Sequence, residues 1–383
     1  MIARVFIGRS LRGFADGFIA VVLPAYLLSL GLGVLEVGII STATLLGSAL
    51  TTLAVGRWGH RFSIRRLLLV AALLMAATGL GFAGFSSFWP LVLVAAMGTL
   101  NPSSGDASVF MPLDHTMLAT APDRTAVFAR YTFLGSMAGA LGALLSGAPE
   151  WLGVPLGAMF VLYGGVGLAV WVLYLGLPDP KVEDQRPAVP LGQSRGIVWR
   201  LAGLFSIDAF AGGLTLNSLL ALWLFERFGM SLGAAGAFFF WTGLLSAVSQ
   251  LAAGPLARRI GMVNTMVFTH IPSSLFLIGA ALAPSLELAL GFLLARSLLS
   301  QMDVPARGAF VMSVVTPAER PAAASFTAVP RSLAAALSPT LTGGLFAAGA
   351  MATPLIACGV LKIAYDLALY AAFRRAERVR SPA

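Results

Sequence analysis

Long apolar runs, separated by short polar stretches, extend along the chain from one end to the other. A helix that crosses a bilayer needs about 20 mainly apolar residues. Windows of that length predict twelve spans, at residues 10–31, 36–56, 67–86, 89–108, 125–146, 155–177, 199–225, 232–255, 263–283, 287–306, 322–346 and 353–373. Because helices satisfy their own backbone groups in lipid, the pattern predicts an all-α polytopic membrane protein with twelve transmembrane helices.

The composition supports this interpretation and excludes the other broad classes. Of the 383 residues, 58% are hydrophobic and 11% charged, with a mean hydropathy of +0.88; soluble domains have about 25% charged residues. Soluble, disordered, collagen-like and disulfide-rich proteins are thereby excluded. The N-terminus resembles a signal peptide, but Asp16 interrupts its apolar run and no cleavage site follows, so we expect a retained span. With Cys358 as the single cysteine and no zinc-binding pattern, we expect no disulfide, metal or cofactor.

The basic residues predict the topology. If both termini are cytoplasmic, 20 of the 25 basic residues lie in cytoplasmic segments and one, Arg227, lies outside. Such an asymmetry indicates an even number of spans with both ends inside. The net charge of +9 is therefore a topological signal, and we expect no nucleic-acid partner. Arginine outnumbers lysine 23 to 2, typical of a GC-rich bacterium, so the predicted location is a bacterial inner (cytoplasmic) membrane.

Residues 178–198 contain four prolines and both charge signs, which predicts a cytoplasmic linker between two six-span halves, residues 1–177 and 199–383. The halves resemble each other at an offset of about 197 residues: Ala49–Gly56 aligns with Ala247–Gly254 without gaps, and Asp16 matches Asp208 after a small shift. Such a duplication predicts two pseudo-symmetric six-helix bundles, an architecture of transporters that carry substrate between their repeats.

Twelve spans, a 6+6 duplication and a central linker resemble the major facilitator superfamily over the whole chain. The loop Gly56–Arg66 is similar to that family's signature of a glycine, three residues, Asp-Arg, one residue, a glycine and a basic pair. Here His60 occupies the acidic position and Ser63 replaces a glycine; a second copy at Gly254–Gly261 has Arg258 in the acidic position. The resemblance implies a cytoplasmic gate, for which the candidates are Arg57, His60, Arg61, Arg65, Arg66, Asp106, Arg258, Arg259, Asp303 and Arg307. Alternatively, the arginines only fix topology. Asp303, four residues from Arg307, is expected to form a local ion pair that supports the gate, with substrate contact as the alternative.

The glycine-rich segment Gly135–Gly147 is similar to span 5 of the family's exporters, although it lacks their Gly-Pro step. Gly135 and Gly139 lie one helical turn apart, which predicts close helix packing. Ser338-Pro339, followed by two glycines, has a similar pattern in span 11. These features favour export over uptake.

Charged residues inside a span are costly and usually face a partner or a watery cavity. Asp16 and Asp208 each lie 7–8 residues beyond a cytoplasmic arginine, roughly 10–12 Å deep. They are candidates for proton coupling or cation recognition, or for static ion pairs. The family's packing would place span 5 beside span 1 and span 11 beside span 7, so we expect Asp16 to lie near Arg130 and Asp208 near Arg331.

Three other features concern the spans. Arg296 has no acid one turn away, and the resemblance places span 10 beside the central cavity, so Arg296 could bind an anionic substrate or pair between helices. Lys362 and Asp366, four residues apart, can neutralise each other. His270 is expected to be a satisfied structural histidine, with a proton relay as the alternative. Candidates for lining the cavity, with ordinary packing as the alternative, are Tyr26, Asn101, Tyr131, Asn217 and Gln250.

These observations predict a secondary transporter working by alternating access, with spans 1, 4, 7 and 10 around the central site. Proton-coupled efflux of a small molecule is the first expectation, and uptake or facilitated diffusion of an organic or inorganic anion is the alternative. The sequence contains no GxSxG, HExxH or Walker pattern that would indicate an enzyme. The expected partners are a small-molecule substrate, protons and the lipid bilayer, and the expected state is a monomer.

Overall fold

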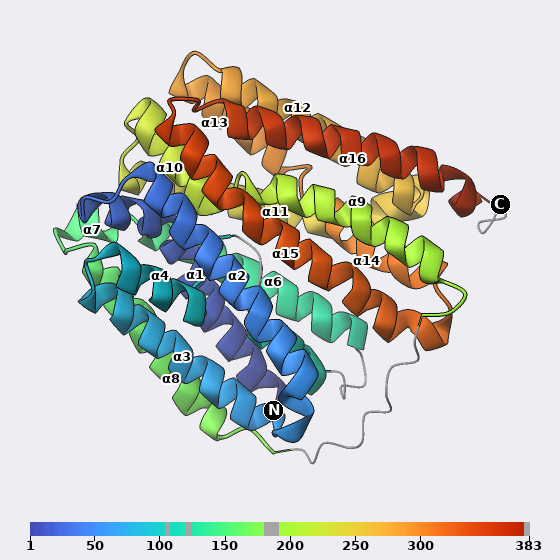
Figure 1. The fold of residues 1–383 in the computed structure, drawn as a ribbon, viewed down its shortest axis with the longest axis horizontal. Coiled ribbons are helices and arrows are strands. Elements are labelled where there is room, and N and C mark those ends of the chain that lie inside the picture. Colours follow the sequence, from blue (N-terminus) through green and yellow to red (C-terminus); the bar gives the residue numbers. More distant parts are fainter. Residues whose placement is uncertain (104–107, 119–123, 180–190, 379–383) are drawn as a thin grey trace. The chain divides into compact units, whose positions relative to one another are not determined.

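The computed structural model describes residues 1–103, 108–118, 124–179 and 191–378, and throughout these ranges the regular structure is helical (Figure 1). The α-helices are α1 (Ile2–Ser29), α2 (Val34–Trp58), α3 (Ile64–Gly84), α4 (Phe88–Met97), α5 (Phe110–Leu118), α6 (Arg124–Leu145), α7 (Ala148–Leu152), α8 (Gly157–Leu175), α9 (Arg195–Gly213), α10 (Asn217–Phe228), α11 (Leu232–Ile260), α12 (Met262–Leu282), α13 (Leu286–Ser297), α14 (Asp303–Val314), α15 (Arg320–Ala347) and α16 (Thr353–Arg378). Two short 3-10 helices, Gly59–Arg61 and Pro317–Glu319, lie in loops. The predicted all-α membrane fold is confirmed.

Nine helices or helix pairs in the described ranges are long and apolar enough to cross a bilayer. The expected spans 4, 10 and 11 correspond to the broken pair α4–α5, the broken pair α13–α14, and the single helix α15. The count of twelve spans therefore stays a prediction, with a helix or helix pair at each expected place.

Spans 4 and 10 are both interrupted near their middle. In span 4, α4 ends at Met97, the described residues 98–103 are not helical, and α5 begins at Phe110. In the other half, α13 stops at Ser297 and α14 begins at Asp303. Both second segments run past the predicted ends of these spans, to Leu118 and Val314, because the break hides their continuation from a 20-residue window. Asp303 and Arg307, which were expected at the cytoplasmic end of span 10, therefore lie within α14.

The contacts between residues group the chain into two units. Unit 1 comprises residues 1–185, 216–243 and 339–349, and unit 2 comprises residues 186–215, 244–338 and 350–383. Unit 1 thus contains α10, part of α11 and the end of α15, which belong to the C-terminal half of the sequence. This grouping by contact differs from the division by repeat, which stays a prediction.

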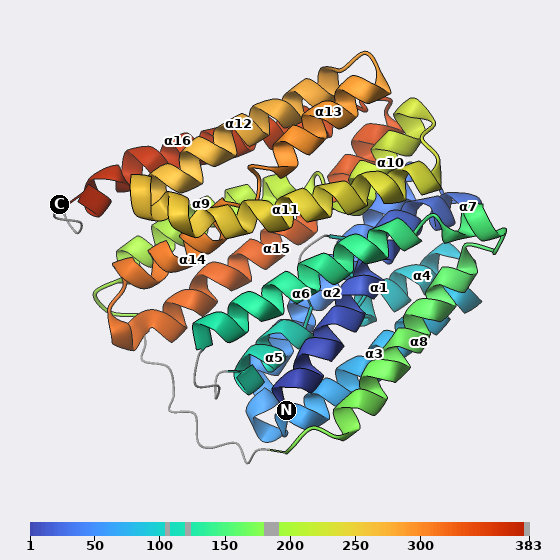
Figure 2. The ribbon, with the colours of Figure 1, turned by 180° about the vertical axis from the view of Figure 1, so that it is seen from behind.

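Unit 1 is held together by close helix contacts at small residues, α1 against α6 and α3 against α8, as both views show (Figures 1 and 2). Gly17 approaches Gly139 so closely that a β-carbon there would lie 2.0 Å from the Gly139 carbonyl oxygen. The close packing predicted from Gly135 and Gly139 is confirmed. The rings of Tyr26 in α1 and Phe160 in α8 contact each other at a tilt of 43°, with their centroids 4.5 Å apart.

At the end of unit 1 that the topology predicts to be external, segments of both sequence halves meet. Thr340 in α15 donates its hydroxyl and its backbone N–H to the hydroxyl of Thr42 in α2, at 2.8 and 3.0 Å. A β-carbon added to Gly38 would lie 2.6 Å from the carbonyl oxygen of Pro339. Glu150 accepts the N–H of Gly233 at the start of α11, at 2.7 Å. These contacts join N-terminal and C-terminal segments within one unit.

Unit 2 packs α12 against α16 and α9 against α16, around an apolar core. That core includes Phe205, Phe310 and Tyr365, all at most 2% exposed. At the end of the linker, Glu319 accepts N–H groups of Gly192 and Ser194, at the start of α9. Hydrogen bonds from the side chains of Ser194 and Thr316, and then from the Gly192 backbone, lower the pKa of Glu319 to about 2. The carboxylate thereby stabilises the N-terminus of α9.

Candidate functional site

The main candidate site is a group of charged side chains inside unit 2, centred on Asp208 of α9. One carboxylate oxygen of Asp208 accepts a hydrogen bond from Arg307 of α14, and the other accepts one from Lys362 of α16, each at 2.7 Å. The Asp208 side chain is only 4% exposed, so little water screens these charges. Arg307 also pairs with Asp303, four residues earlier, at 3.2 Å, which confirms the predicted local pair.

The group continues onto α12. His270 Nδ1 lies 3.1 Å from both carboxylate oxygens of Asp366, and His270 Nε2 lies 3.3 Å from Lys362 Nζ. Asp366 is fully buried and His270 is 3% exposed. The expectation that His270 has its hydrogen bonds satisfied is confirmed. A continuous line of contacts therefore runs from Arg307 through Asp208, Lys362 and His270 to Asp366, across four helices. We call these five residues, together with Asp303, the unit 2 charge cluster.

Helix geometry explains why these side chains converge. Cys358, Lys362 and Asp366 follow one another at intervals of four residues, which puts them on one face of α16. On α9, Phe205 lies one turn before Asp208, and the Arg307 guanidinium carbon lies 5.6 Å from the centre of its ring. Asp303 is in the first turn of α14, where the helix dipole favours a carboxylate. The break before α14 thus places Asp303 and Arg307 in the interior.

Of the sequence expectations about this cluster, one is met in part and one is wrong. Asp208 lies within electrostatic reach of Arg331, as expected, but its hydrogen bonds come from Arg307 and Lys362. Lys362 and Asp366 do not neutralise each other, since Lys362 turns to Asp208 and Asp366 to His270. Asp303 and Arg307, assigned to a cytoplasmic gate, are buried. Arg331 lies within electrostatic reach of Asp208, and its buried Nε has no hydrogen-bond partner among the described residues.

Arg296, at the end of α13, is half-buried. Within the described part of the chain, no hydrogen bond or ion pair of its guanidinium is formed, although it lies within electrostatic reach of Cys358. The Cys358 thiol itself lies 3.4 Å from the hydroxyl of Thr215, in the break after α9. Among the described residues Arg296 thus forms no direct pair with an acid, and its role in anion binding stays a proposal.

Unit 1 contains a second buried ion pair, which the sequence did not reveal. Arg12 of α1 donates to Asp114 of α5 at 2.5 Å, and the two side chains are 3% and 0% exposed. Arg12 also donates to the Tyr174 hydroxyl, and the Tyr131 hydroxyl donates to the same Asp114 oxygen at 2.8 Å. The ring of Phe110 lies 4.1 Å below the guanidinium, a cation–π contact. Asp114 was not among the candidates from sequence, because span 4 was expected to end at residue 108.

The two ion pairs occupy corresponding places with opposite polarity. In each half of the sequence, an ion pair joins the first helix (α1 or α9) to the second segment of the broken fourth span (α5 or α14). In unit 1 the cation is on the first helix and the acid on the segment, Arg12 with Asp114; in unit 2 Asp208 supplies the acid and Arg307 the cation. Asp16, which matches Asp208 in the alignment, lies one turn beyond Arg12. An ion pair therefore joins the corresponding elements in both halves of the sequence, with its charges exchanged.

The predicted contact between Asp16 and Arg130 is wrong, although α1 does pack against α6. Gly13 faces Gly135 and Gly17 faces Gly139, which aligns Asp16 with position 138. Arg130 is thus eight residues, about 12 Å, further toward the start of α6. Arg130 is exposed there, while Asp16 is half-buried.

The five candidates for lining a cavity have different surroundings. Tyr26 is buried and donates to the carbonyl of Phe82 at 2.5 Å, and the Asn101 side chain accepts from the backbone N–H and the hydroxyl of Ser103. Tyr131 belongs to the unit 1 ion pair. Asn217, at the start of α10, and Gln250 in α11 are half-buried. Packing therefore accounts for Tyr26, while a cavity role for the others stays a prediction.

The loop residues predicted to form a gate are mostly at the surface. Arg65 differs, since it is half-buried and donates to the carbonyl of Leu175 at the end of α8. The exposed ones are Arg57, His60, Arg61, Arg66, Arg258 and Arg259. Asp106 lies outside the described residues. The second loop copy ends at Gly261, whose φ of 92° allows α12 to begin directly after α11.

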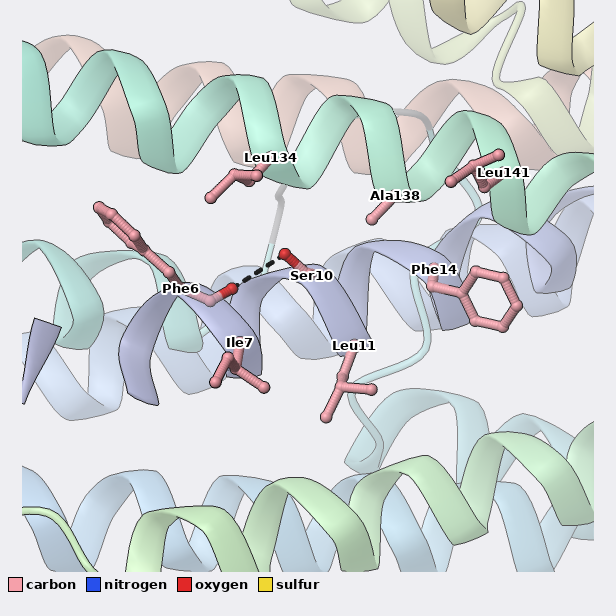
Figure 3. Close-up of a pocket in the computed structure, with 8 residues that line it drawn as sticks. All are labelled: Phe6, Ile7, Ser10, Leu11, Phe14, Leu134, Ala138 and Leu141. Carbon is pink, nitrogen blue, oxygen red and sulfur yellow. Dashed lines mark hydrogen bonds between the residues drawn. The ribbon is translucent and has the colours of Figure 1, made fainter. Parts of the chain in front are cut away.

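An apolar groove of about 440 Å³ lies along α1 and α6 in unit 1 (Figure 3). It is lined by Ile7, Leu11 and Phe14 of α1 and by Leu134 and Leu141 of α6, among others. The Ser10 hydroxyl donates to the carbonyl of Phe6 within its own helix, as the dashed line shows. With no free polar group offered by these side chains, the groove suits an acyl chain and cannot orient a polar substrate. In the described ranges, no three His, Cys, Asp or Glu side chains come together as metal ligands would.

The family profile of the Major Facilitator Superfamily matches residues 5–302, more than three quarters of the chain. The chain belongs to the major facilitator superfamily. The uncharacterized membrane protein YJR124C of Saccharomyces cerevisiae is 23% identical over 410 aligned positions, which cover 95% of this chain and 92% of the yeast protein. The predicted family is therefore confirmed, and with it a multi-pass membrane protein of a transporter family.

Solved structures of superfamily transporters share the fold. The nucleoside transporter NupG superposes with a TM-score of 0.75 at 14% identity, covering 97% of this chain and 99% of NupG. A bacterial homolog of the human lysosomal transporter Spinster, in an inward-facing and occupied conformation, gives 0.75 at 17%, covering 100% and 98%. The human organic anion transporter MFSD10 gives 0.71 at 18%, covering 96% and 98%. At such identities the likeness establishes the fold alone.

Proposed function

We propose that this superfamily member is a proton-coupled secondary transporter that moves a small molecule by alternating access. The observation that carries the proposal is the unit 2 charge cluster, in which Asp208 bonds with Arg307 and Lys362 inside the spans. A charge at mid-bilayer costs about 2.5–3.5 kcal/mol on insertion scales. Well-packed apolar residues would often stabilise a fold as well as a buried ion pair does. Function, rather than stability alone, therefore explains why three acids and two permanent cations lie together.

The broken helices support the same proposal. Discontinuous spans in transporters occur near binding sites, where freed backbone groups and helix ends can meet a substrate. Here α13 and α14 are separated just before Asp303, and α9 and α10 just after Gly213. Both breaks flank the unit 2 charge cluster along the sequence.

Alternating access also requires contacts that separate. Within unit 1, the hydrogen bonds between Thr42 and Thr340 and between Glu150 and Gly233 join the two sequence halves at the predicted external end. We infer that these contacts close that end and break when it opens. Three short hydrogen bonds and a glycine contact are a modest barrier, of the order of 1 kcal/mol per hydrogen bond.

Export is the proposed direction, because the glycine-rich α6 is similar to span 5 of the family's exporters. Uptake or facilitated diffusion of an anion is the second candidate, and a specific observation favours it. In unit 2, Arg296 has no acidic partner among the described residues and Arg331 has an unbonded Nε. Two guanidiniums that are not neutralised by direct bonds can receive a carboxylate or phosphate. The proposed location is a bacterial cytoplasmic membrane with both termini inside, and the proposed state is a monomer.

The experiment is transport by the purified full chain in proteoliposomes with an imposed pH gradient. The probes are radiolabelled uridine, as a nucleoside, p-aminohippurate, as an organic anion, and a set of cationic drugs. We expect at least one probe to move against its gradient when pH differs across the membrane, and to stop when the protons are equilibrated by a protonophore. Asp208→Asn should abolish this movement, whereas Glu226→Gln, which changes an exposed acid at the end of α10, should not.

Movement that persists unchanged in the protonophore would refute proton coupling and leave facilitated diffusion. If p-aminohippurate alone moves, and Arg296→Gln stops it, the anion candidate replaces the first one. Turnover of any probe into a product, measured in parallel, would instead indicate an enzyme.

A further inference from the structure

His270 lies on α12, at the far end of the unit 2 charge cluster from Arg307. When Asp366 is ionised its two oxygens can only accept, so Nδ1, which lies 3.1 Å from both, carries the hydrogen. The other ring nitrogen, Nε2, then has a lone pair, which accepts from the Lys362 ammonium at 3.3 Å. The contacts thus define a neutral imidazole with one site open to a proton.

Asp208 is a poor carrier of a proton, even though it is the centre of the cluster. Arg307 and Lys362 each donate to it at 2.7 Å. A proton on Asp208 would leave these two buried cations facing each other without their shared counter-ion, which is the costly case for buried pairs. Histidine, by contrast, is the side chain whose charge ordinarily changes between pH 5 and 8.

We propose that His270 binds the coupling proton at Nε2, with Asp366 as its counter-ion. Once protonated, His270 replaces Lys362 as the hydrogen-bond donor to Asp208. This inference rests on the proposed function. With Nε2 protonated, the imidazolium and the ammonium would face each other as two donors 3.3 Å apart. Asp208 Oδ1, which Lys362 now occupies, is 3.9 Å from His270 Nε2. A small shift lets the imidazolium take that oxygen while Lys362 withdraws.

The surroundings of His270 make the exchange the favoured response. Tyr365, also on α16, presents its ring edge-on at 6.2 Å and carries no charge when protonated. α14 supplies Arg307 and Asp303. α13 supplies Arg296, whose carbonyl accepts from Ser273 one turn along α12, and α15 supplies Arg331, within electrostatic reach of Asp208.

Counting these groups, the three acids of the cluster face four cations before His270 is protonated. Adding one more positive charge increases the repulsion among these cations, and moving one cation toward water lowers it. Lys362 is the group to move, since its side chain is 12% exposed and those of its partners are at most 8% exposed. Its departure changes the bonds that hold α9 to α16, while Arg307 still joins α9 to α14. A proton taken up on span 9 thus alters the attachment of span 7.

The first test observes the proton directly and needs no substrate. The chain has three histidines, His60, His115 and His270, so ¹⁵N-histidine NMR of the full chain in lipid nanodiscs resolves each, assigned by single His→Gln replacements. We expect His270 Nδ1 to be protonated throughout and Nε2 to be the nitrogen that gains a proton when the medium is acidified. Lys362→Met should raise the proton affinity of Nε2 at least tenfold, and Asp366→Asn should lower it at least tenfold. An Nε2 that stays unprotonated, or that ignores both substitutions, would overturn the proposal.

The second test links this proton to transport, with the probe found to move in the proteoliposome panel. In His270→Gln, movement driven by a pH gradient should fall at least tenfold, whereas exchange of labelled for unlabelled probe without a gradient should stay within twofold. His115→Gln is the matched control and should leave both unchanged. If the gradient drives wild type and His270→Gln equally, coupling resides elsewhere and the inference is wrong. If the gradient drives neither, the proposed function fails, whatever the NMR titration shows.

Discussion

The buried pair of Arg12 and Asp114 makes a prediction that can be worked out from the structure. Asp114→Ala removes a carboxylate that pairs with Arg12, and the two side chains are 3% and 0% exposed. Removing one partner of a buried ion pair typically costs about 3–5 kcal/mol, because the other charge is left without compensation. Arg12 keeps the Tyr174 hydroxyl and the Phe110 ring, which places the expected loss near 3 kcal/mol.

Tyr131 adds to this loss, because its hydroxyl donates to Asp114 at 2.8 Å and is buried. A buried donor without an acceptor costs about 1–3 kcal/mol. The single variant Asp114→Ala should therefore lower the free energy of unfolding by about 3–5 kcal/mol. Replacing both partners, Arg12→Met with Asp114→Ala, should recover at least half of that loss, since no charge is then left unpaired.

The assay is reversible unfolding in mixed micelles with increasing SDS, followed by tryptophan fluorescence. A double-mutant cycle with Arg12→Met, Asp114→Ala and their combination isolates the pair. The predicted coupling energy is at least 2 kcal/mol. Additive effects of the two single variants, or a loss below 0.5 kcal/mol in Asp114→Ala, would refute the conclusion that this pair is buried and mutually compensating.

Three other changes give clear outcomes. Gly17→Val should prevent α1 from approaching α6, and lower the yield of folded protein on size-exclusion chromatography, whereas Gly56→Ala, with open space around it, should not. Glu319→Gln should speed hydrogen exchange at the amide of Ser194 at pH 7, because this amide donates to the carboxylate. In the wild type, the carboxylate should protect the amide fully above about pH 4.5. The protection should be lost as the pH falls toward 2, because folding lowers the pKa of Glu319 to about 2. Thr340→Val should weaken the contact with Thr42 by about 1 kcal/mol. It should also increase labelling of a cysteine placed at Ala43, beside Thr42, relative to the same cysteine with Thr340 intact.

The fold could be predicted well from sequence because its dominant signal is local. Apolar windows of one span length, together with arginine placement, depend only on neighbouring residues, and the family and the all-helical architecture are confirmed. Spans 4 and 10 were assigned ends at 108 and 306, because a broken helix has two short apolar segments and no single full-length window. That error moved Asp114, Asp303 and Arg307 from the interior to the cytoplasmic side.

The partners of the charges could not be predicted, because they depend on helix register. Asp208 was correctly selected as an intramembrane acid, but an offset of one or two turns between helices decides whether Arg331 or Arg307 meets it. The same applies to Asp16 and Arg130, which the glycine contacts separate by about 12 Å along α6. One available signal was missed: Lys362 and Asp366 share a face of α16, so both could have been directed at a third helix rather than at each other.

The most direct measurement of the central claim is the internal pH of pyranine-loaded proteoliposomes while a gradient of the transported probe is imposed. Starting from equal pH on both sides, the account predicts that the probe gradient changes the internal pH with wild-type protein, and that Asp208→Asn abolishes this change. A probe that crosses the membrane through the wild-type protein while the internal pH stays constant would contradict it.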